Sequence, residues 1–229
     1  MHKLIRQSLA KLNIFTAFLM AALLIAGAGT ATYVLASDVS EFSQTISAGT
    51  LSVDFVDASL NSVASPSVIM GGITFSFSTQ DSNGQLGTDS QRILASNPTQ
   101  TPAWSVTIAA ATSTTLWQNA GPSKYFDFND SSGYTDGADA DSYGGQMTIT
   151  PTTGTITGVS GCATDNVTKG SEASFVEGTT DNIEIMSADA SAPVECRWYF
   201  IGAADNVTQK IPASQGVDTY TIDLTLTIS

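Results

Sequence analysis

The residues best suited to chemistry are oxygen ligands gathered in one stretch of the chain. Residues 127–141 read DFNDSSGYTDGADAD, and hard cations such as calcium need several such oxygens at once. An EF-hand order is not met, because a loop begun at Asp127 has Ser132 at its glycine position and Ala138 at its glutamate position. The stretch predicts either a calcium site or a solvated loop held by Asx-turns. The candidate ligands are Asp127, Asn129, Asp130, Asp136, Asp139 and Asp141.

Aromatic side chains offer a second kind of site, because their faces stack on the apolar faces of sugars. Trp104 alternates in phase with Val106 and Ile108, which predicts a place in the core. Trp198 lies beside Cys196, where packing on a disulfide is expected. Trp117 has neither constraint and is the candidate glycan-binding residue.

Charge and residue types exclude several classes of function. The net charge is −13, and from residue 37 onward 5 basic groups face 21 acidic ones, a balance of −16, which repels nucleic acid and anionic lipid. The only histidine is His2, so the body of the chain has no His triad and no HExxH zinc site. No Gly-x-Ser-x-Gly motif is present. The sequence therefore predicts a protein that is not an enzyme.

The first 36 residues predict export. Three basic residues before position 12 precede an apolar run from Leu12 to Ala28, and Val34-Leu35-Ala36 before Ser37 has the small residues of a cleavage site. The alternative is a retained N-terminal membrane anchor, since the run is about 17 residues long, near the lower limit for a spanning helix. Either way the body is expected outside the cytoplasm, secreted or at the cell surface. Contact with the membrane is expected only through an uncleaved N-terminal segment.

Cys162 and Cys196 fit an exported chain, in which two cysteines most simply form one disulfide. The bond would close a loop of about 35 residues and stabilise the fold by roughly 3 kcal/mol. Two free buried thiols and a thiol–metal pair are the alternatives. A metal is disfavoured because no histidine accompanies the thiols.

The pattern from residue 38 onward has period two, with Thr and Ser between apolar residues. This pattern, with turns rich in Gly, Asn and Asp such as 81–84 and 97–98, predicts an all-β fold, an antiparallel β-sandwich. We expect one domain over 37–229 with a long acidic loop near 119–145. The alternating rows lie at 51–55, 73–77, 104–108, 147–149, 183–185 and 220–228.

The N-terminal region resembles a known family. LIAGAGTATY at 24–33, Asp38, and FSQTISAGTLSV at 42–53 are similar to the start of TasA/camelysin-type exported proteins, over roughly residues 20–56. The resemblance implies a jelly-roll sandwich that assembles into extracellular matrix fibres by donating its N-terminal segment as a strand. Camelysins are grouped as metallopeptidases, but that activity is not expected here because no His site exists.

A second likeness is to WxL-type cell-surface domains, through Trp104-Ser105-Val106-Thr107 and the closing row 220–228. The closing row has Leu224-Thr225-Leu226 and no Trp, so peptidoglycan attachment is not implied. The sequence as a whole predicts an exported structural protein that self-associates through strand exchange into fibres. The alternative is a monomeric module that binds cell-wall glycan through Trp117, organised by calcium.

Overall fold

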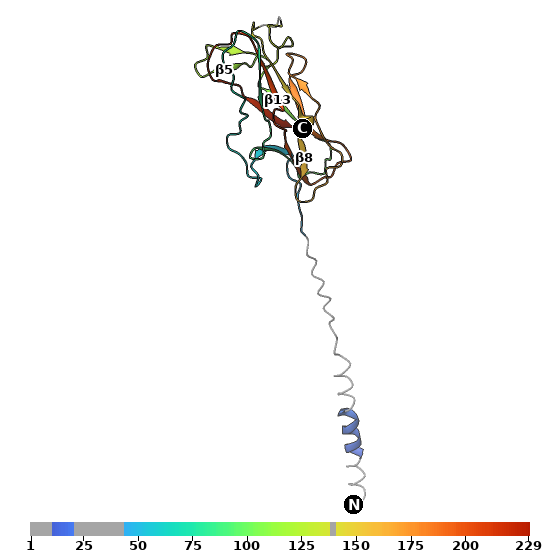
Figure 1. Cartoon of the computed structure of the whole chain (residues 1–229). Coiled ribbons are helices and arrows are strands. Elements are labelled where there is room, and N and C mark those ends of the chain that lie inside the picture. Colours follow the sequence, from blue (N-terminus) through green and yellow to red (C-terminus); the bar gives the residue numbers. More distant parts are fainter. Residues whose placement is uncertain (1–10, 21–43, 138–140) are drawn as a thin grey trace, which may run out of the picture. The chain divides into compact units, whose positions relative to one another are not determined.

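The computed structural model describes residues 11–20, 44–137 and 141–229, in two units that divide after Ile46. In the first unit, residues 11–20 form a helix with exposed side chains (Figure 1). Within the described ranges, no helix is both long enough and apolar enough to span a bilayer. The cleavage site expected around residues 34–37 lies outside the described residues.

The second unit is built from antiparallel strands (Figure 1), which confirms the predicted all-β antiparallel sandwich. The strands are β1 (Ser52–Val56), β2 (Gln80–Gly84), β3 (Arg92–Asn97), β4 (Trp104–Ala110), β5 (Trp117–Asn119), β6 (Tyr125–Phe126), β7 (Gln146–Ile149), β8 (Thr155–Gly158), β9 (Val167–Lys169), β10 (Ala173–Ser174), β11 (Asn182–Ala188), β12 (Cys196–Ile201), β13 (Val207–Ile211), β14 (Tyr220–Thr221) and β15 (Leu224–Ile228). A short 3-10 helix, η1 (Pro151–Thr153), joins β7 to β8.

The first layer is a bent sheet in two halves, ordered β1-β3-β12-β8 and β10-β7-β13-β2. Three pairs of consecutive strands run from one half to the other, with one strand of each pair in each half. These pairs are β2 and β3, β7 and β8, and β12 and β13. Asn206 joins the halves at the bend, where its Oδ1 accepts the Leu86 amide at 2.8 Å and its Nδ2 donates to the Leu86 carbonyl at 3.2 Å. The bend therefore depends on a buried side chain that replaces backbone pairing.

The second layer is ordered β15-β4-β11-β9, and β14-β5-β6 continues it because β14 precedes β15 and β5 follows β4. Side chains of both layers meet in one core. Trp104 from β4 lies 5.4 Å from Trp198 of β12 between ring centroids, and both rings are buried. The predicted core position of Trp104 is confirmed.

The closing row was predicted correctly and two other segments were not. Residues 220–228 form β14 and β15, which pair with β5 and β4. Residues 73–77 are not a strand, because the chain leaves the edge of β2 after Gly71 and no strand of the described ranges pairs with it. Residues 81–84, expected as a turn, belong to β2, because pairing with β13 outweighs their local turn preference.

The buried positions of β2 are occupied by small residues, and the packing around them explains why. Ser82 and Gly84 are buried along β2. Residues 68–70 cover Gly84, and the Ser82 hydroxyl donates to the Gly71 carbonyl. A Cβ on Gly84 would lie 2.5 Å from the Met70 sulfur and 3.1 Å from a Val68 methyl carbon. The alternation in β2 is therefore one of small inward and polar outward residues, which a hydrophobic pattern does not reveal.

Candidate functional site

The sandwich is open along one side, where the two layers end in strands that pair with no further strand within the described residues, apart from the bridge from Met70 to Gly84 of β2. The first layer ends there in β2 and the second in β14 and β15. Two cavities of about 310 Å³ each lie between these strands and share Met70, Trp117 and Tyr220 as lining residues. We call the two cavities and the three flanking strands the open edge.

The inner cavity is a gap in the hydrophobic core. Buried side chains from both layers form its walls, among them Leu86, Ile108, Met147 and Ile149. Leu224 of the closing strand lies on its rim and is only half-buried. Packed interiors have few voids larger than a water molecule, so this gap leaves apolar surface without a partner.

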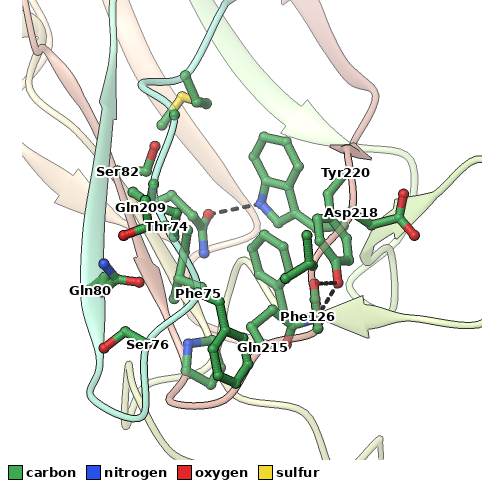
Figure 2. A pocket seen from close by; sticks show the side chains of 18 of the residues that line it. Thr74, Phe75, Ser76, Gln80, Ser82, Phe126, Gln209, Gln215, Asp218 and Tyr220 are labelled. Atoms are coloured by element: carbon green, nitrogen blue, oxygen red, sulfur yellow. Dashed lines mark hydrogen bonds between the residues drawn. The ribbon is translucent and has the colours of Figure 1, made fainter.

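The outer cavity combines aromatic and amide side chains (Figure 2). Gln209 is buried, accepts the Trp117 indole N–H at 2.9 Å and donates to the Asp127 carbonyl at 2.9 Å. Gln215 donates to the Tyr220 hydroxyl at 2.9 Å. Lysine and arginine are missing from the residues lining this cavity, and the one charged lining residue is Asp218. The arrangement suits an uncharged ligand with hydroxyl groups and an apolar face.

Hydrogen bonds among Asp218, Asn119 and Lys124 fix the position of Asp218, which lines the outer cavity. Asp218 accepts Asn119 Nδ2 at 2.9 Å and Lys124 Nζ at 3.1 Å, which ties β5 to the segment before β14. These hydrogen bonds, that from Asn119 first, lower the pKa of the Asp218 carboxyl below its usual value. The carboxylate is therefore charged at neutral pH.

Trp117 forms a wall between the two cavities. Its ring is 9% exposed and stacks on Phe126 at 5.6 Å between centroids. It is therefore not an open platform on the surface. A ligand would reach the ring only from within the open edge.

The acidic loop places its candidate ligands in different surroundings. Asp127 and Asp130 are buried, and Asp136 is exposed. Asp130 Oδ1 accepts the Ser132 amide at 2.7 Å and its Oδ2 accepts the Gly137 amide at 2.5 Å. Similar turns are made by Asp127 Oδ1, which accepts the amides of Phe128 and Asn129, and by Asp141 Oδ1, which accepts the Tyr143 amide. Asn129 is buried and its Nδ2 donates to the Ser113 carbonyl.

These hydrogen bonds from backbone amides to nearby aspartate side chains are Asx-turns, one of the two structures that the sequence predicted for this loop. Within residues 44–137 and 141–229, no three carboxylate, thiol or imidazole groups gather closely enough to hold a metal ion. Asp139 lies outside the described residues. Calcium binding by this loop stays a prediction.

Cys162 and Cys196 form a disulfide, with their Cα atoms 5.8 Å apart, which confirms the predicted pairing. The bond ties the start of β12 to the loop after β8. Trp198, two residues further along β12, donates its indole N–H to the Ala163 carbonyl at 2.8 Å. The loop is therefore fixed by a covalent bond and a neighbouring hydrogen bond.

Comparison with models of known protein families, with curated proteins and with solved structures finds no match.

Proposed function

We propose that this protein is an exported structural protein of the cell surface or extracellular matrix, which self-associates into fibres by strand exchange. The observation that carries the proposal is the open edge. Within the described residues, its flanking strands β2 and β15 lack an outer strand over most of their length. A largely apolar gap of about 310 Å³ lies between β15 and residues 66–70, of which Met70 bridges to Gly84 of β2. An added strand would pair with a free edge and fill the gap with its inward side chains.

The segment before β1 supplies the strand that would be added. Residues 44–50 form no strand, and their one backbone hydrogen bond within the described part of the chain runs from the Gly49 amide to the Pro98 carbonyl. Ile46 in this segment is 89% exposed. Removal of the signal would free the residues from Ser37 to Ala48 to enter the open edge of a neighbouring copy. The resemblance to TasA-type proteins supports the same role for this segment.

Two further observations support export. The disulfide favours an oxidising compartment. The acidic body keeps a secreted chain soluble before assembly. In this proposal the protein works by association and carries out no reaction.

The test is negative-stain microscopy and size-exclusion chromatography of the chain from Ser37. We expect filaments, and we expect Ile46→Asp to abolish them because a charge cannot enter an apolar gap. Ser47→Asp is the matched control, since it adds the same charge at the next position. Both side chains are exposed, so neither change disturbs the folded unit. A monomer at high concentration from the unchanged chain would contradict the proposal.

Calcium is proposed as the organiser of the acidic loop, because two carboxylates there, Asp127 and Asp130, are buried, which is rare for this residue type. Isothermal titration with calcium chloride is the measurement. Asp136→Asn should weaken binding at least several-fold while leaving the fold intact, because Asp136 is exposed. Asp165→Asn, an exposed acid outside the loop, is the control. Absence of heat with the unchanged chain would remove calcium from the proposal.

A second candidate function is binding of an uncharged cell-wall glycan, favoured by the aromatic and amide lining of the outer cavity around Trp117. Titration with cello-, chito- and malto-hexaose tests it. Gln80→Ala should weaken binding, because Gln80 lines the cavity, whereas Gln118→Ala, exposed on β5 and outside the lining, should not. Equal affinities for the two variants would contradict a site in this cavity.

A further inference from the structure

The segment from Gly71 to Ser78, which we call the arm, carries large apolar side chains on the surface. Ile73, Phe75 and Phe77 alternate with Thr74 and Ser76 and are 41%, 48% and 83% exposed. Phe75 and Phe77 touch edge to face with centroids 5.1 Å apart, so they lie on one face of the arm. Contiguous exposed apolar rows of this kind mark interaction surfaces on soluble proteins.

The backbone of the arm is also largely unpaired. The Gly71 amide donates to the Asn83 carbonyl at 2.6 Å, and the Ser76 carbonyl accepts the Ser214 amide at 2.8 Å. Between these two anchors, no backbone hydrogen bond is made by Ile73, Thr74 or Phe75 within the described residues. Residues 71–76 contain no turn or bend, and the chain bends at Phe77 and Ser78. Unpaired backbone of this kind presents donors and acceptors to a strand that lies alongside it.

The distribution of charge along the sequence favours a second copy of this chain as the partner of the arm. No charged residue occurs from Ala58 to Gln80, although residues 37–229 carry 21 acidic groups against 5 basic ones. Two copies of such an acidic protein repel each other over most of their surfaces. Asp218 lines the same cavity as Ile73 to Ser76. The stretch that contains the arm itself adds no charge, so a second copy that approaches along it meets less of that repulsion.

We propose that the arm is a self-pairing strand, which joins two copies of this chain as an antiparallel pair about a twofold axis. The residues ITFSFST at 73–79 have high β-propensity, no charge and no proline, the composition that favours strand pairing between chains. The contact is isologous, so both copies contribute the same residues. It uses no residue of the N-terminal segment, although Ile73 to Ser76 also line the outer cavity of the open edge. The two proposals are therefore separated by a change in the N-terminal segment alone.

The apolar row determines the register. Because side chains alternate with period two, the two rows face each other in registers that differ by two residues. The register with Phe75 opposite Phe75 and Ile73 opposite Phe77 is the one that pairs all three residues of the row. A slip by one residue would place the aromatic rings opposite serine and threonine. In the expected register the two Phe75 Cα atoms lie about 4.5–5.5 Å apart, within reach of a disulfide.

Cysteine cross-linking tests this register, because the two native cysteines are already bonded to each other. The exported chain carrying Ile46→Asp is used throughout, which removes strand exchange without touching the arm. Phe75→Cys should give a covalent dimer under mild oxidation. Phe77→Cys is the matched control, since two residues 77 would be about 13 Å apart along the pair and could not bond.

Analytical ultracentrifugation without cross-linking gives the second readout. Phe77→Asp should weaken the dimer at least tenfold, whereas Ser90→Asp, which adds the same charge at an exposed site away from the arm, should change it less than twofold. Equal cross-linking of Phe75→Cys and Phe77→Cys, or a monomer with no cross-link at Phe75→Cys, would overturn self-pairing of the arm. Strand exchange is tested by filaments of the chain with its native Ile46, and the arm is tested in the Ile46→Asp chain. A negative result for one proposal therefore leaves the other standing.

Discussion

Buried amide side chains hold together the places where this sandwich departs from regular pairing. Asn206 spans the bend of the first layer. Gln209 of β13 reaches the second layer, where it accepts the Trp117 indole N–H and donates to the Asp127 carbonyl. Both side chains are at most 2% exposed. An amide can donate and accept at once, so one side chain satisfies a backbone N–H and C=O that would otherwise be buried alone.

Asn206→Ala should lower the free energy of unfolding by about 1–3 kcal/mol, because it leaves the Leu86 amide and carbonyl buried without partners. Urea unfolding followed by tryptophan fluorescence measures the change. Asn83→Ala removes an exposed hydrogen bond to Thr208 and should cost far less. Equal losses in the two variants would argue that Asn206 does not hold the bend.

Tyr134 sets a limit to stability at high pH. Its hydroxyl donates to Asp81, and this bond, with partial burial, raises the pKa of Tyr134 to about 12. The folded pKa lies above the unfolded value, so the stabilisation is complete below pH 10 and is lost as the pH rises through 12. Unfolding midpoints measured between pH 9 and 12 should fall in the unchanged chain. They should fall less in Tyr134→Phe, whose residue at this position cannot ionise.

At the scale of elements, the outcome depended on whether an alternating row found a neighbour. The row at 104–108 became the central strand β4, paired with β11 and β15. The row at 73–77 has the same alternation and lies unpaired as the arm. Polar residues 81–84 formed β2 because β13 offered a complete edge. An alternating sequence can form a strand, but it does so only where another strand offers unpaired backbone groups beside it.

The disulfide is the clearest element-scale contribution to stability. It joins residues 34 positions apart, and its loss should lower the free energy of unfolding by roughly 3 kcal/mol, mainly by enlarging the unfolded ensemble. Urea unfolding of the double variant Cys162→Ser with Cys196→Ser measures this. Reduction of the unchanged chain should give the same loss. A difference beyond about 1 kcal/mol between the two would point to packing changes at the serines.

At the scale of the whole molecule, the acidic surface opposes the association that the open edge and the arm would make. Raising sodium chloride from about 0.02 M to about 0.5 M shortens the Debye length from roughly 20 Å to roughly 4 Å and should therefore strengthen self-association several-fold. Light scattering at constant protein concentration measures it. Dissociation by salt would mean that ion pairs, rather than apolar and backbone contacts, hold the copies together.

The fold class and the core position of Trp104 could be predicted from the sequence, because period-two alternation is a local pattern. The disulfide could be predicted because the chain has two cysteines, which have only each other as partners within it. It also singled out Trp117, as the tryptophan that neither a strand pattern nor a neighbouring cysteine assigns to the core. Three features required the three-dimensional structure: Trp117 separates two cavities, residues 73–77 form no strand, and Asn206 and Gln209 hold buried hydrogen bonds. These outcomes depend on which segments lie side by side across the two layers, and contacts between residues far apart in the chain leave no mark in a local pattern.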